Sequence, residues 1–408
     1  MNSNQKLAKM TLRNVFLLFY ILFFSTNINA QTVNSENTLG FNYTIPSKIL
    51  KEDKQIQIFL PESYERTDKK FPVLYILDGQ RLFPFGVSLL KSFTQFKQTP
   101  EFIVVGITNK YPDRFGHFSD EEKKFLTFVE EDVVSFVDNS FRTSNERLIF
   151  GWEYAGSFVI QTMIDKPNLF DAYLVASPFP LTNKITQIDN FLSENLNYNK
   201  MLYFSVSPNE NQVNIGTQKL DSVLKLKAPK SLNWTYKKLE NEEHRSTPYS
   251  TIYFGLKNFY HYYPELQFNN LKEFTNIGGL DYVKKYYKKR ALDYGFSSDL
   301  SDWTMFSLTR NAIRANDYAQ FNLLVNEFKK TGVLERIRVN RSCLIAEFYL
   351  ENKQYEKAIE IFTLLAEKYP NSERPLIGLG DSYKELQDKR KSSIYYRKAE
   401  KISKNKSN

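Results

Sequence analysis

Between about residues 40 and 265, short apolar runs alternate with longer amphipathic segments. Several runs are apolar at consecutive positions, as expected for strands buried on both faces of a parallel sheet. The alternation of strand and helix predicts an α/β fold with a doubly wound, mostly parallel sheet. The runs predicted to be strands are 55–60, 72–77, 102–107, 147–151, 172–177, 201–206 and 233–239.

Two of the intervening segments have the periodicity of helices. Segment 156–167 is one predicted crossover helix, and segment 121–141 is the other. The second segment repeats apolar side chains at helical spacing, so one of its faces is expected to pack on the sheet. That face is formed by Phe125, Phe128, Val129, Val133, Phe136 and Val137.

From about residue 270 the strand pattern stops, and the chain becomes helical and amphipathic. Four pairs of similar residues lie 34 positions apart, and Pro370 closes the first unit. This period resembles the tetratricopeptide repeat, in which small residues stand where helices touch. The resemblance covers about 339–403, residues 303–338 are read as a degenerate preceding helix pair, and the alternative is two unrelated helical hairpins. The pairs are Ala346 and Gly380, Tyr349 and Tyr383, Ala358 and Ser392, and Phe362 and Tyr396.

The N-terminus has the pattern of an export signal. Three basic residues precede the apolar run 15–24, and small and polar residues up to Ala30 follow it, which predicts a signal peptide over 1–30. The run is too short to span a bilayer, and a retained anchor is the alternative. The protein is therefore expected to be periplasmic or secreted, with no integral membrane span after cleavage. The remaining chain is predicted to form an esterase-like domain over 31–268 and a helical domain over 269–408.

Composition narrows the classes of function. Removing the three positive charges of the signal peptide lowers the formal net charge from +9 to +6, and this surplus is spread along the helices. Nucleic-acid binding is therefore not expected. The single cysteine, Cys343, rules out an intramolecular disulfide and is predicted to be buried. The three histidines lie far apart without ligand spacing, so neither a metal site nor a cofactor is expected.

The stretch 148-LIFGWEYAGSF-158 has the form of a strand, a sharp turn and a helix. This arrangement is typical of the elbow that presents a catalytic serine in α/β-hydrolases. Gly151 and Gly156 supply the small residues that such a turn needs. Glu153 stands where the serine is expected, and Ala155 stands where the second glycine is expected.

Five blocks around this elbow resemble the esterase D-like branch of the α/β-hydrolases, the "putative esterase" family that includes siderophore and feruloyl esterases. The resemblance covers about 225 residues, and the blocks occur in the order of the family. One departure is that 109-NKYPDRF-115 replaces the Arg-x-x-Asp run of the family. The blocks are 59–83, 102–107, 141–158, 167–180 and 244–260.

The resemblance implies a role for each matching residue. His244 corresponds to the general base, and Glu210 stands where the acid of the triad belongs. The oxyanion hole would be formed by the backbone amide of Tyr154 and by that of Gly79 or Gln80. The identity of the acid stays open, because other carboxylates are available at Asp221, Glu240, Glu242 and Glu243.

The glutamate at the elbow changes the expected chemistry. We expect a catalytically impaired or inactive homologue, in which the Glu153 carboxylate occupies the oxyanion position as a mimic of an acid product and pairs with His244. The alternative is an active carboxylic-ester hydrolase that uses His244 with Glu153 as base or nucleophile. Expected ligands are a small ester or siderophore-like molecule in the pocket and a protein or peptide on the helical repeats.

Overall fold

The computed structural model describes residues 38–407, and the signal peptide expected over residues 1–30 lies outside them. Export therefore stays a prediction. No helix among the described residues is both long and apolar enough to cross a membrane.

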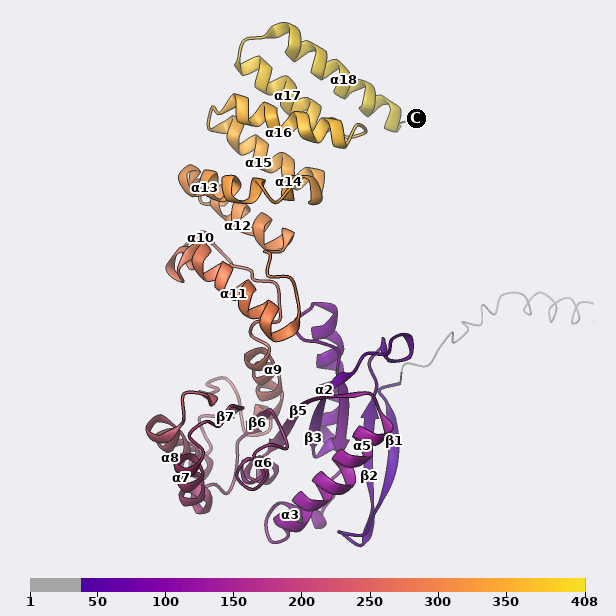
Figure 1. Ribbon diagram of the computed structural model, residues 1–408, viewed down its shortest axis with the longest axis vertical. Coiled ribbons are helices and arrows are strands. Elements are labelled where there is room, and N and C mark those ends of the chain that lie inside the picture. Colours follow the sequence, from indigo (N-terminus) through magenta and orange to yellow (C-terminus); the bar gives the residue numbers. More distant parts are fainter. Residues whose placement is uncertain (1–37, 408) are drawn as a thin grey trace, which may run out of the picture. The chain divides into compact units, whose positions relative to one another are not determined.

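One sheet of eight strands organises the first part of the described chain (Figure 1). Its order is β1-β2-β4-β3-β5-β6-β7-β8. The first two strands run antiparallel to their neighbours, and the pairs from β4 to β8 are parallel. The predicted fold class is confirmed. The strands are β1 Phe41–Ser47, β2 Glu52–Phe59, β3 Phe71–Leu77, β4 Ile103–Ile107, β5 Thr143–Trp152, β6 Ala172–Ala176, β7 Met201–Val206 and β8 Asn233–Lys238.

Helices cover both faces of this sheet, so successive side chains of the inner strands are buried in two different cores. On β3, for example, Val73 and Tyr75 belong to one core, whereas Leu74 and Ile76 belong to the other. The second core is completed by α2 and α9, and the first by the other long helices. The helices of this part are α2 Gly79–Gln95, α3 Asp113–Phe118, α4 Glu122–Thr127, α5 Ser135–Ser140, α6 Tyr154–Asp165, α7 Ile185–Glu194, α8 Asn211–Lys227 and α9 Thr247–Phe259, with short 3-10 turns η1 Tyr64–Arg66 and η3 Thr182–Lys184.

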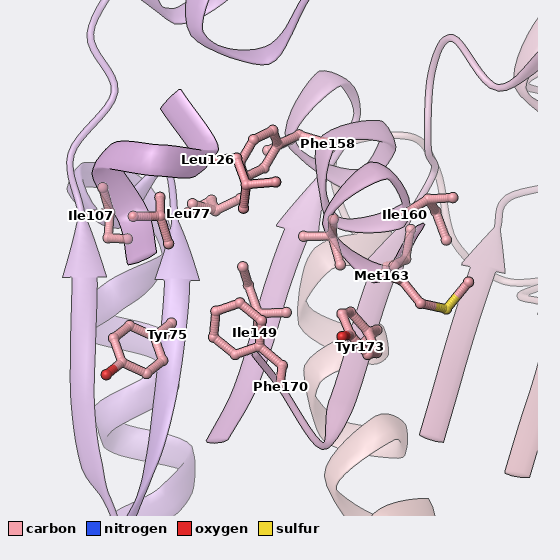
Figure 2. Close-up of a cluster of buried hydrophobic side chains, with 14 of the residues drawn as sticks. Tyr75, Leu77, Ile107, Leu126, Ile149, Phe158, Ile160, Met163, Phe170 and Tyr173 are labelled. Carbon is pink, nitrogen blue, oxygen red and sulfur yellow. The ribbon is translucent and has the colours of Figure 1, made fainter. Parts of the chain in front are cut away.

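Figure 2 shows how the first core joins strand and helix. Tyr75 and Ile149 on the strands belong to the same cluster as Phe158 and Met163 of α6, and all four side chains are fully buried. Because α6 follows directly after β5, this packing fixes the direction in which the helix leaves the turn at Glu153.

The helix predicted over 121–141 is present, but it is not a regular α-helix throughout. A π-helical stretch, η2 Phe128–Val134, joins α4 to α5. The predicted apolar face is buried as expected, except that Phe136 is only partly buried. The wider π turn changes the angular position of later residues, a shift that the apolar spacing does not reveal.

The described chain after the sheet is helical, and its last helices form the expected repeats. Gly378 lies against the ring of Phe362, and Gly380 lies against the ring of Tyr396, so a side chain larger than hydrogen would collide with each ring. The predicted degenerate pair corresponds to α12 and α13. The helices are α10 Leu271–Asn276, α11 Gly279–Tyr294, α12 Asp302–Arg314, α13 Tyr318–Lys329, α14 Val333–Arg336, α15 Val339–Glu351, α16 Tyr355–Lys368, α17 Glu373–Glu385 and α18 Lys389–Ser407.

Cys343 is buried in α15, and burial raises the pKa of its thiol to about 12. The thiol is therefore protonated at neutral pH and unreactive, in agreement with the structural role expected for it.

The domain boundary predicted between residues 268 and 269 stays a prediction.

The elbow supplies a test of this fold. A Cβ atom on Gly151 would lie 2.3 Å from the carbonyl oxygen of Ala155, which belongs to the backbone of α6. Since backbone cannot move aside cheaply, Gly151→Ala is expected to lower the free energy of unfolding by about 1–3 kcal/mol. Urea unfolding followed by circular dichroism measures this. Gly116→Ala is the matched control, because a Cβ atom there meets nothing within 4 Å; equal stability of the two variants would contradict the assignment.

Candidate active site

The candidate residues lie after the carboxyl ends of parallel strands. Asp78 follows β3, Glu153 follows β5, Glu210 follows β7 and His244 follows β8. Arg114, in the short helix α3 after β4, joins them. In sheets of this type the carboxyl ends of the strands meet at one edge, which is where ligands bind.

Glu153 occupies a sharp turn between β5 and α6. Its backbone has φ 60° and ψ −120°, a conformation that costs a residue with a side chain on the order of 1–3 kcal/mol. Backbone hydrogen bonds hold the turn: the Glu153 amide donates to the Ala176 carbonyl, and the Phe179 amide donates to the Glu153 carbonyl, both at 3.0 Å. The backbone at Glu153 therefore has the conformation of an elbow, and the carboxylate stands at its tip.

The carboxylate of Glu153 is held by Arg114. Arg114 Nη1 donates to Glu153 Oε2 at 3.1 Å. The same guanidinium is fixed on its other side by Asp78, to which Nε donates at 2.9 Å and Nη2 at 2.8 Å. The Asp78 side chain is completely buried, so its charge requires a partner of this kind. Arg114 thus bridges two carboxylates, and its position is set by the buried one.

His244 is oriented by Glu210. The two side chains meet at 2.6 Å between His244 Nδ1 and Glu210 Oε2. Because a carboxylate only accepts hydrogen bonds, Nδ1 carries the proton and Nε2 is directed away from the pair. The other oxygen, Glu210 Oε1, accepts from the Ser177 hydroxyl at 2.8 Å and from the Ser207 amide at 2.8 Å. Of the carboxylates that the sequence left open, Asp221 pairs instead with Lys225.

The second nitrogen of His244 faces the elbow. His244 Nε2 lies 4.0 Å from Glu153 Oε1. Trp152 supports the histidine, since its indole Nε1 donates to the His244 carbonyl at 3.0 Å and its ring lies 5.0 Å from the imidazole. The structure therefore brings Glu153, Glu210 and His244 together, in the chain order expected for a nucleophile, an acid and a base.

The charges of this site stabilise the protonated form of His244. The hydrogen bond to Glu210 raises the pKa of His244, and the charges of Glu210 and Glu153 act in the same direction. Burial opposes ionisation of Glu210, but its hydrogen bonds from His244 and Ser207 outweigh this effect and lower the pKa of the carboxyl. Burial likewise opposes the charge of Arg114, and its contacts with Asp78 and Glu153 raise its pKa. Carboxylates and cationic side chains therefore alternate through the site, in the order Asp78, Arg114, Glu153, His244 and Glu210.

Of the residues predicted for the oxyanion hole, Tyr154 directly follows the turn, and Gly79 and Gln80 follow β3. Tyr154 is the first residue of α6, and its ring packs 5.2 Å from Phe115 and 5.7 Å from Phe179. Gly79 begins α2. The Gln80 side chain is hydrogen-bonded to Asn109, because Gln80 Nε2 donates to the Asn109 carbonyl at 2.7 Å. Glu153 makes no side-chain capping bond to α6. The carboxylate is therefore held by a cation, whereas the product-mimic hypothesis expected backbone amides.

Sequence reasoning missed Arg114 and Asp78. Both lie in segments that were singled out, Asp78 in 75-YILDG-79 and Arg114 in 109-NKYPDRF-115, where the family pattern was found to be altered. A guanidinium near an elbow carboxylate could have been suspected from charge alone.

Ser157, the nearest hydroxyl along the chain, is buried and donates to the Pro180 carbonyl at 2.5 Å. Residues 38–407 contain no cluster of His, Cys, Asp and Glu suited to hold a metal ion.

Comparison with known proteins decides the family. The family model described as "Putative esterase" matches residues 47–254, half of the chain. The chain belongs to this family. A second model, tetratricopeptide repeat, matches residues 344–372 and confirms the repeat.

Individual relatives are more distant. The chain resembles the Ferri-bacillibactin esterase BesA of Bacillus subtilis, with 33% identity over 73 residues, 17% of this chain and 25% of that protein. Overall, the chain spans between a quarter and about half of the length of the curated relatives that it matches.

Solved structures support the fold. An IroE-like serine hydrolase from Shewanella oneidensis superposes with a TM-score of 0.52 at 20% identity, covering 70% of this chain and 98% of that chain. An uncharacterised protein from Capnocytophaga ochracea gives a TM-score of 0.50 at 19% identity, covering 88% and 93%.

The electrostatics of the site predict how the three histidines titrate. By NMR, His244 is expected to have a pKa above 6.5, whereas burial lowers the pKa of His117 and of His261 below that value. Glu210→Gln is expected to lower the pKa of His244, and the exposed Glu240→Gln serves as control. An unchanged pKa of His244 in Glu210→Gln would contradict the pairing.

The same pair makes stability depend on pH. A histidine with a raised pKa contributes stability that is complete below about 6.5 and is lost as the pH rises through its folded pKa. Glu210, whose pKa is lowered, contributes stability above about 4.5 that is lost as the pH falls through its folded pKa. Thermal unfolding should therefore show the largest difference between the wild type and Glu210→Gln between these two limits.

Proposed function

We propose that this protein is a non-hydrolytic member of the putative esterase family that retains a ligand pocket and serves in binding or scaffolding. The observation that carries the proposal is the ion pair of Glu153 with Arg114, at 3.1 Å, at the position where the family presents its nucleophile. At that position a carboxylate that is already paired with Arg114 replaces the hydroxyl nucleophile.

The chemistry of the family requires a proton that Glu153 does not supply. Serine becomes a nucleophile when histidine removes its hydroxyl proton, and a carboxylate has no equivalent proton. Loss of the serine in a serine hydrolase reduces turnover by about 10⁶-fold. Ester hydrolysis by the family route should accordingly be nearly absent.

An active hydrolase is the second candidate, and the intact pair of His244 and Glu210 favours it. In this case Glu153 would attack as a nucleophile or act as a base. The ion pair with Arg114 opposes both roles, because it stabilises the carboxylate in its resting state and occupies Oε2. The extra methylene of glutamate also moves the oxygens by about 1.5 Å relative to an aspartate nucleophile, a displacement large enough to impair attack.

The ligand of the pocket is proposed to be a small ester or a siderophore-like molecule that binds without turnover. Support comes from aromatic side chains beside the site, where Phe115 is 47% exposed and packs against Tyr154. Similarity to a ferri-bacillibactin esterase over 73 residues points in the same direction. We further propose that residues 1–30 direct export, that residues 31–268 and 269–408 form separate domains, and that the repeats bind a protein partner.

Restoring the serine tests the proposal. Glu153→Ser is expected to raise kcat/KM on a short-chain aryl ester by at least about 100-fold over the wild type, the lower range for general base catalysis. The gain should disappear in Glu153→Ser combined with His244→Ala. The measurement is a steady-state assay on residues 31–408.

The matched control is Glu153→Gln, which removes the charge and keeps the size but supplies no nucleophile. It is expected to remain inactive. Efficient hydrolysis by the wild type that Glu153→Gln abolishes would refute a non-hydrolytic role.

A further inference from the structure

Two arginines in the helical region share one aromatic surface. Arg310 on α12 lies 5.4 Å from the ring centre of Trp303 and 5.7 Å from that of Phe306. Arg341 on α15 lies 4.8 Å and 5.1 Å from the same two rings. The helices α12 and α15 pack against each other. We call these four side chains the arginine–aromatic cluster.

The cluster has positive charges without a described counter-charge. Burial lowers the pKa of Arg310, and the positive charges of Arg314 and Arg341 lower it further. The Nε atom of Arg310 is buried and has no hydrogen-bond partner among residues 38–407. Neighbouring arginines differ, because Arg336 is paired with Asp302 at 2.7 Å and Arg374 with Glu347 at 2.7 Å.

Stability alone does not account for this arrangement. Stacking on an aromatic ring contributes modestly to folding for one arginine. A second arginine on the same rings adds repulsion, and a buried donor without a partner costs free energy. Such a combination is typical of a site whose missing partner is a ligand that carries the opposite charge.

We propose that the arginine–aromatic cluster binds a carboxylate side chain of an acidic peptide segment in a partner protein. The guanidinium group matches a carboxylate with two parallel hydrogen bonds. Leu344, three residues after Arg341 on α15, is 38% exposed and offers an apolar contact to a side chain next to the carboxylate. A free inorganic anion would not use that contact, which favours a peptide.

The cluster lies outside residues 47–254, which match the esterase family, so its binding is independent of the chemistry at Glu153. The inference rests on the proposed binding of a protein partner by the repeats, so its failure would leave the proposal for Glu153 in place.

The test measures binding of a short fluorescein-labelled peptide, rich in glutamate with one leucine, to residues 31–408 by fluorescence polarisation. The same peptide with every glutamate replaced by glutamine is the ligand control. Arg310→Gln and Arg341→Gln are each expected to weaken binding of the acidic peptide by about tenfold, the loss of one charge-assisted hydrogen bond. The glutamine peptide is expected to bind at least about tenfold more weakly to the wild type.

The protein control is Lys285→Gln combined with Lys288→Gln, which removes two exposed charges from α11. It is compared with Arg310→Gln combined with Arg341→Gln, which removes the same charge. This control is expected to bind like the wild type. Equal losses in the lysine and arginine variants would overturn the proposal, since they would show a general charge effect. Complete displacement of the peptide by inorganic phosphate at the concentration of the peptide would also overturn it in favour of a simple anion site.

A variant at an exposed position distinguishes a loss of binding from a loss of folding. Arg314→Gln lies on the surface of α12, so it should leave the melting temperature unchanged. Because Arg314 adds to the positive charge at Arg310, this variant is expected to weaken acidic-peptide binding about twofold to fivefold at low salt. Unchanged binding in Arg314→Gln, Arg310→Gln and Arg341→Gln would overturn the proposal.

Discussion

The bridge that Arg114 forms between Asp78 and Glu153 determines what the site can do. Asp78 is fully buried, and an isolated buried charge is far more costly than a paired one, so Arg114 is held in place by the fold and not by a ligand. Its remaining Nη1 then meets Glu153 at the tip of the elbow. The Glu153 carboxylate is thus part of the ion network that Asp78 and Arg114 form. This is why a glutamate can stand in a strained turn that the family uses for its nucleophile.

The fold of this protein does not by itself decide its chemistry. The chain matches the putative esterase family over residues 47–254, and His244 meets Glu210 at 2.6 Å. An esterase fold, however, fixes only where side chains are presented, and the reaction depends on which side chains they are. With a carboxylate at the elbow, the same scaffold offers an anionic group beside the imidazole of His244. A scaffold of this kind can still recognise a ligand without converting it.

Much of the fold could be predicted from the sequence because buried parallel strands are apolar at consecutive positions. The strand Phe41–Ser47 was missed, since it lies at the edge of the sheet, is mostly exposed and contains a proline. His244 could be proposed because it lies in a family block, and Glu210 because it stands where the acid of the triad belongs in chain order, although the identity of the acid was left open. The contact of Arg114 with Asp78 joins residues 36 positions apart, and no local spacing encodes such a pair. The π-helical stretch Phe128–Val134 was hidden for a similar reason, since the apolar pattern is compatible with either helix.

The central claim is that Glu153 does not take part in ester cleavage. The most direct measurement is to incubate the wild-type protein with an aryl ester in water enriched in oxygen-18 and to analyse the peptide containing Glu153 by mass spectrometry. A carboxylate nucleophile forms a mixed anhydride with the acyl group, and its hydrolysis can leave solvent oxygen in the glutamate. Our account predicts that the ester is consumed at the rate in buffer and that Glu153 gains no oxygen-18. Turnover well above that rate, together with oxygen-18 in the Glu153 carboxylate, would contradict it.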